Sequence, residues 1–189
     1  MAFLTKRKIC ITLLSFLFLF QSLAYAQEPK LTNIIVTNTR DDLLIYLNVE
    51  GAFTEKMKSA VLSGVPTTFS FFITLYISRN LWADKEIADI KVTHAIKYDT
   101  LKKEFVVSRS WGNDEPSATQ SFEEAQQLMT QIDSLKVAPL SLLEKGRPYQ
   151  IRAKAELSKV TLPFYLHYVL FFVSLWDFET ELAVIDFIY

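Results

Sequence analysis

Strict alternation of apolar and polar side chains constrains this chain more than any other feature of its sequence. Between residues 149 and 158, every odd position is apolar and every even position is polar, in the run YQIRAKAELS. Successive side chains of a β-strand point to opposite faces, so this pattern predicts a strand with one buried face and one exposed face. An amphipathic helix would instead repeat its apolar residues every three or four positions.

The same two-residue period recurs along most of the chain. It marks residues 31–38, 43–50, 66–78, 87–98, 103–111 and 181–189. The polar turn Thr39–Asp42 separates the first two of these segments, which together predict a hairpin. We expect about eight strands, and no strand–helix–strand repeat joins them. The sequence therefore predicts a mainly β domain, an antiparallel β-sandwich-like fold, in place of a parallel α/β fold.

Two short helices are predicted by their capping residues. Thr54 is a good N-cap and Gly64 a good C-terminal stop, which indicates a helix over residues 54–63. Ser121 followed three residues later by Glu124 is a capping box, and the apolar spacing after it predicts a helix to about Asp133. The apolar stretch 160–176 could add a third helix.

The N-terminus has the three parts of a secretory signal peptide. Lys6, Arg7 and Lys8 precede an apolar run over residues 9–20. The motif Ala24-Tyr25-Ala26, which is typical of a cleavage site, follows this run. We expect cleavage after Ala26, which places residues 27–189 in the periplasm or another exported compartment as one domain. The alternative is an uncleaved anchor that tethers the protein to the inner membrane, because residues 9–26 approach the minimum length of a membrane span.

Removal of the signal also changes the chemistry available to the chain. Its single cysteine, Cys10, is lost, so disulfides, thiolate nucleophiles and cysteine metal ligands are excluded from the mature domain. The 20 basic residues fall to 17 against 21 acidic ones, a formal charge of −4. An acidic domain of this kind argues against a nucleic-acid partner.

Catalytic and metal-binding signatures are scarce. The two histidines, His94 and His167, have no partner histidine at metal-ligand spacing, and no serine lies in a nucleophile elbow. We therefore predict no metal, no cofactor and no catalytic residue. His94 is in phase with Val92 and Ile96, which favours a structural role. The acidic run Asp177, Glu179, Glu181 is typical of a solvated strand edge.

The apolar stretch 160–176, VTLPFYLHYVLFFVSLW, has three interpretations. It could be buried against the sheet, dock to a membrane surface or an envelope protein, or span the membrane a second time. Burial is favoured because the stretch is short for a span and is interrupted by Pro163, His167 and Ser174. Docking remains open, and the residues predicted to carry it are Tyr165, His167, Tyr168, Phe172 and Trp176.

Several segments together resemble a known family. They are residues 34–51 (IIVTNTRDDLLIYLNVEG), Lys97-Tyr98-Asp99, residues 122–125 (FEEA), residues 162–166 (LPFYL) and Trp176-Asp177-Phe178. This set resembles the DUF4390 family of bacterial exported proteins over nearly the whole mature chain. The resemblance implies export and a single domain, and it transfers no catalytic residue because the family's function is unknown.

The functional prediction follows from these observations. We expect a non-enzymatic cell-envelope protein that binds a protein partner or an apolar ligand. The alternative, from another class, is a metal-independent periplasmic hydrolase that uses Asp and His residues. The sequence does not predict an oligomeric state.

Overall fold

The structure, a computed structural model, describes residues 28–79, 82–111, 115–158 and 178–189. In these residues two antiparallel sheets form the protein, so the predicted mainly β fold is confirmed. The signal-peptide prediction falls on residues outside the described ranges. None of the described helices is long and apolar enough to cross a membrane.

The smaller sheet has three strands in the order β1-β2-β7. Strands β1 (Lys30–Asn38) and β2 (Asp42–Glu50) are the predicted hairpin. Strand β7 (Gln131–Pro139) pairs with the other edge of β2. The alternation in β2 buries Leu43, Ile45, Leu47 and Val49 on one face.

The larger sheet has six strands in the order β6-β5-β4-β3-β8-β9. Their bounds are Ser117–Thr119 for β6, Glu104–Arg109 for β5, Lys85–Asp99 for β4, Thr67–Ile77 for β3, Pro148–Leu157 for β8 and Ala183–Ile188 for β9. Strands β3 and β4 form a long hairpin, and β8 pairs with the other edge of β3. In this pairing the large Phe71 and Ile73 lie beside the small Ala155 and Ala153.

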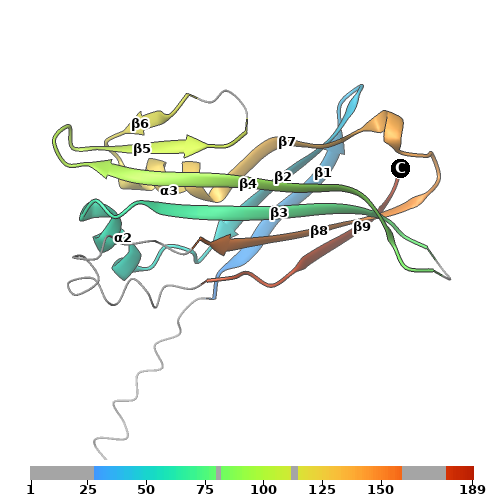
Figure 1. Cartoon of the computed structure of the whole chain (residues 1–189), viewed down its shortest axis with the longest axis horizontal. Coiled ribbons are helices and arrows are strands. Elements are labelled where there is room, and N and C mark those ends of the chain that lie inside the picture. Colours follow the sequence, from blue (N-terminus) through green and yellow to red (C-terminus); the bar gives the residue numbers. More distant parts are fainter. Residues whose placement is uncertain (1–27, 80–81, 112–114, 159–177) are drawn as a thin grey trace, which may run out of the picture.

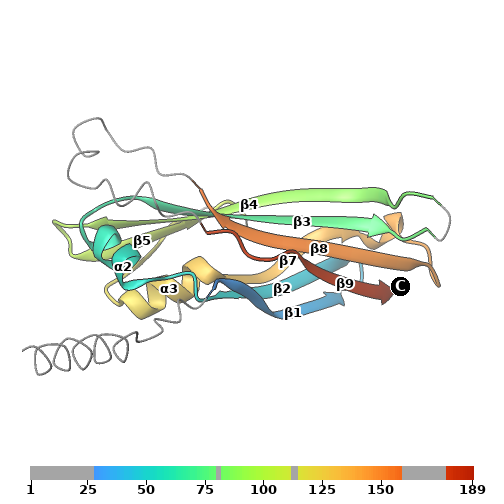
Figure 2. The ribbon, with the colours of Figure 1, turned by 90° about the horizontal axis from the view of Figure 1, so that it is seen from below.

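The two sheets lie in separate layers, and their inner faces share one core (Figure 2). Helices α2 (Glu55–Leu62) and α3 (Phe122–Thr130) lie at one end of the long axis (Figure 1). Each begins at its predicted cap, because the Thr54 and Ser121 hydroxyls accept hydrogen bonds from the amides of Met57 and Glu124. The opposite end carries the β3–β4 connection and a 3-10 turn, η1 (Leu140–Leu142).

Two parts of the predicted secondary structure need correction. The second helix ends at Thr130 instead of Asp133, and Gln131 is already extended, with φ −101° and ψ 134°. The chain continues directly as β7, a strand that the sequence did not predict, and Ile132 pairs with Leu47 of β2. Register shifts in the β2–β7 pair disturb the two-residue period, so pairing with β2 determines this strand. The three-residue strand β6 was also missed.

Candidate functional site

The structure does not test the predicted docking residues. Tyr165, His167, Tyr168, Phe172 and Trp176 all belong to the stretch 159–177, which lies outside the described residues. The described part of the chain offers two other places to look for function. One is the buried His94, and the other is a groove at the end of the molecule away from the helices.

His94 is buried in the core between the large sheet and α3. Its Nδ1 lies 3.0 Å from the carbonyl oxygen of Met129, and its Nε2 accepts a 2.8 Å hydrogen bond from the indole Nε1–H of Trp111. Because Nε2 is an acceptor, Nδ1 carries the proton and donates to Met129, which is the neutral form of the ring. The ring also packs against Phe71, with centroids 4.8 Å apart.

Burial lowers the pKa of His94 from 6.5 to about 4, and the nearby charge of Arg109 adds to this effect. The backbone hydrogen bond to Met129 acts in the opposite direction and is outweighed. The ring therefore stays neutral at physiological pH, and both nitrogens already have protein partners. This geometry fits the structural role that the sequence favoured for His94.

No described carboxylate bonds to the His94 ring, and several carboxylates are paired with basic residues. Asp42 binds Lys136 at 2.7 Å and Glu179 binds Lys154 at 2.7 Å. Asp84 binds Arg152 at 2.8 Å. Within the described ranges, no three His, Cys, Asp or Glu side chains gather in one group. These three carboxylates thus form ion pairs with neighbouring segments.

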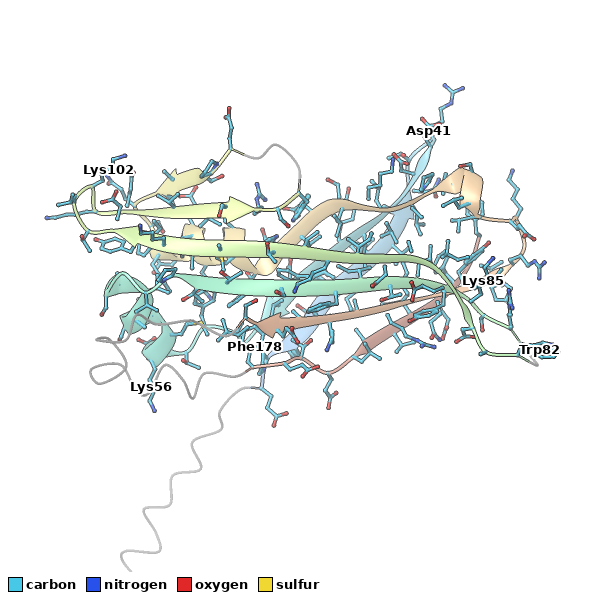
Figure 3. The ribbon with its side chains drawn as sticks, in the orientation of Figure 1. Asp41, Lys56, Trp82, Lys85, Lys102 and Phe178 are labelled. Atoms are coloured by element: carbon cyan, nitrogen blue, oxygen red, sulfur yellow. The ribbon has the colours of Figure 1, made fainter. Side chains whose placement is uncertain are left out.

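The end groove is a cleft of about 640 Å³ at the end of the sandwich opposite the two helices. Its lining brings together Arg79, Trp82, Lys85, Leu142, Arg147 and Tyr149. Trp82 and Lys85 mark this extremity of the molecule in Figure 3, far from Lys102 at the other end. A smaller cleft of about 490 Å³ continues it along the end of β9, toward Phe187 and Ile188.

Local hydrogen bonds build the walls of the end groove. The Ser78 amide donates to the carbonyl of Pro148, which fastens the end of β3 to the start of β8. The Tyr149 ring is buried at the base, and its hydroxyl accepts a 2.8 Å hydrogen bond from the amide of Glu144. This bond positions the loop after η1. The groove is thus framed by regular strands, while its rim consists of loop side chains.

Two features distinguish the rim chemically. Trp82 is 79% exposed and Leu142 55% exposed, so large apolar groups face solvent. Arg79, Lys85 and Arg147 surround them, whereas Glu144, bound to Arg147 at 2.9 Å, is the one acidic residue of the described lining. Neither Arg79 nor Lys85 forms an ion pair with any described residue. The rim therefore places positively charged side chains beside exposed apolar ones.

Sequence reasoning missed this groove. Residues 79–84 lie between the alternating segments 66–78 and 87–98, and no function was predicted for them. A signal was present, because Trp82 lies between the cations Arg79 and Lys85 in a segment that joins two predicted strands. Tryptophan is highly buried on average, so an indole in such a loop is uncommon. Its neighbours Leu142, Arg147 and Tyr149 come from another part of the chain, and only the β3–β8 pairing brings them to it.

Comparison with known proteins identifies the family. The family model described as "Domain of unknown function (DUF4390)" matches residues 26–186. No curated protein and no solved structure matches the chain. Since the family model covers well over half of the sequence, the chain belongs to the DUF4390 family, as its resemblance predicted.

Proposed function

We propose that this chain is an exported, non-enzymatic protein of the cell envelope that binds a protein partner through the end groove. The observation that carries the proposal is Trp82, an indole that is 79% exposed at the tip of a long hairpin. A large aromatic side chain in solvent gains free energy when a partner covers it, and tryptophan is enriched among the residues that dominate binding interfaces.

The charges around Trp82 indicate what kind of partner fits. Arg79 and Lys85 are free of ion pairs within the described residues, in a chain whose overall charge is slightly negative. Such a local concentration of positive charge attracts an acidic surface and orients it during encounter. We therefore propose a partner segment that combines an apolar side chain, packed on Trp82 and Leu142, with a carboxylate near Lys85. A wholly apolar ligand would leave these cations unpaired.

The hydrolase alternative has less support. A general base must reach the proton that it abstracts, and both ring nitrogens of His94 are held by Met129 and Trp111 inside the core. No described carboxylate bonds to this ring. Binding rather than hydrolysis is therefore the function that the described residues support best.

Site-specific photocrosslinking in cells tests the proposal. A benzophenone amino acid replaces Trp82 in the full-length protein, and the control carries it at Lys102, a turn residue at the opposite end (Figure 3). We expect one defined protein adduct from position 82 and none of the same size from position 102. Adducts to lipid alone, or equal adducts at both positions, would contradict a protein partner at the groove.

Charge reversal tests the chemistry of the same site. Lys85→Glu should reduce the adduct at position 82 several-fold, since it replaces attraction to an acidic segment by repulsion. Lys102→Glu is the matched control and should leave the adduct unchanged. An adduct that is insensitive to Lys85→Glu would refute the acidic character of the partner.

A further inference from the structure

The four outer strands of the two sheets differ in how their free edges are protected. An unprotected edge presents unpaired amides and carbonyls to other chains, and proteins usually interrupt it with bulges, prolines, charges or short length. Strand β1 is interrupted by a register shift between Thr32 and Ile35, with Asn33 at φ 50°. Its edge is therefore irregular in the middle.

The other edge of the small sheet is protected in a similar way. Strand β7 pairs with β2 through two register shifts, contains Ser134 at φ 53° and ends at Pro139. In the large sheet, β6 protects its edge by shortness, because it has only three residues. Three of the four described edges are thus protected by an irregular backbone or by short length.

Strand β9 has no register shift and no proline, and its one charged residue is Asp186. Its six residues, AVIDFI, pair with β8 in unbroken register from Pro148↔Ile188 to Ala153↔Ala183. The strand contains no proline, glycine or lysine. Among the described strands, β8 is its one hydrogen-bonded neighbour, and β9 forms the outermost strand of its sheet in Figure 1. Its exposed face carries Val184 and Ile188, which are 49% and 75% exposed.

Asp186 determines which strand can be added. It lies between Val184 and Ile188 on the exposed face, where its Oδ1 accepts a 2.8 Å hydrogen bond from Gln150. Strand β9 of a second copy could pair antiparallel with this β9 so that the exposed faces of both strands lie on the same side of the joined sheet. In such registers Asp186 lies directly opposite Asp186 of the second copy, or diagonally from it at about 7–8 Å. Both placements bring like charges together, which opposes self-association through β9.

We propose that the edge of β9 away from β8, to which no described strand bonds, is a strand-addition site for an extended segment of another protein. This segment pairs antiparallel to β9 and carries a lysine or arginine opposite Asp186, with apolar side chains two residues to either side. Main-chain hydrogen bonds supply affinity in this mode of recognition, and the alternate side chains supply specificity. The inference does not depend on the end groove, because it rests on a different surface and a different kind of contact.

A peptide-binding experiment tests the proposal. The probe is a capped seven-residue peptide with the sequence TVTKTVT. The control peptide, TVTETVT, has glutamate in place of lysine. Binding to the mature protein is followed by NMR, together with hydrogen exchange of the β9 amides. We expect the lysine peptide to bind three- to tenfold more tightly than the glutamate peptide and to slow exchange of the outward β9 amides.

The charge-swapped variant Asp186→Lys separates recognition from folding. It should reverse the preference of the two peptides while the amides of β3 and β8 keep their slow exchange. The proposal is overturned if neither peptide protects β9, or if Asp186→Lys leaves the preference unchanged. It is equally overturned if the protein without peptide forms dimers in which the outward β9 amides are protected.

Discussion

The buried His94 ring makes the stability of the protein depend on pH between about 4 and 6.5. Its pKa is about 4 in the folded protein and 6.5 in the unfolded chain, because burial disfavours the charged ring. Below pH 6.5 the unfolded chain therefore binds a proton that the folded protein does not. The contribution of His94 to folding stability is fully present above pH 6.5 and is lost as the pH drops toward 4.

The size of the effect follows from this shift. One pKa unit corresponds to about 1.4 kcal/mol, so the loss attributable to His94 is about 2 kcal/mol at pH 5 and about 3 kcal/mol below pH 4. With a urea dependence of roughly 2 kcal/mol per molar for a domain of this size, the unfolding midpoint should fall by about 1 M between pH 8 and pH 5.

Urea unfolding of a His94→Gln variant isolates this contribution from the carboxylates, which titrate in both proteins. Both proteins also carry His167→Gln, so that His94 is the only histidine that can titrate in the reference protein and the variant has none. We expect His94→Gln to be the less stable protein at pH 8, because it loses the fitted ring between Met129 and Trp111. The gap should shrink by about 2 kcal/mol at pH 5. A gap of equal size at both pH values would refute the assignment of a neutral, buried ring.

Two further predictions concern the packing around this residue and the first helix. Trp111→Phe keeps an aromatic ring but removes the indole donor to His94 Nε2, so we expect a loss of about 1–2 kcal/mol in urea unfolding at pH 8; unchanged stability would show that this bond contributes nothing. Gly64 has φ +83°, and a Cβ there would contact no atom within 4 Å. Gly64→Ala should therefore cost about 1–2 kcal/mol through backbone strain alone, and a thermal midpoint equal to that of the parent would contradict this.

Much of the secondary structure could be predicted because its determinants are local. The caps at Thr54 and Ser121 act within one helical turn. The stop at Gly64 is a Schellman motif, in which the Val65 amide donates to Ala60 and the Gly64 amide donates to Val61. Each of these interactions joins residues no more than five positions apart, so the sequence around them contains the whole reason for their structure.

The phase of each strand was also predictable, whereas its neighbours were not. Alternation identified the buried faces of β3 and β8, but only the fold pairs Phe71 with Ala155 across them. Strand β7 escaped prediction because its register shifts remove the two-residue period. The role of His94 was inferred from its phase with Val92 and Ile96, while its partners Met129 and Trp111 belong to other segments.

The sequence by itself therefore determined that this chain is mainly β, because alternation and capping act between near neighbours. It also determined, through the match to the family model, that the chain belongs to the DUF4390 family. Only the tertiary structure decided which segments form the two proposed binding sites. The end groove combines Trp82 of one hairpin with Leu142 and Arg147 of a later loop, and β9 is an edge strand because β8 is its one hydrogen-bonded neighbour among the described strands. Both sites depend on which strands become neighbours, and contacts between distant segments determine that choice.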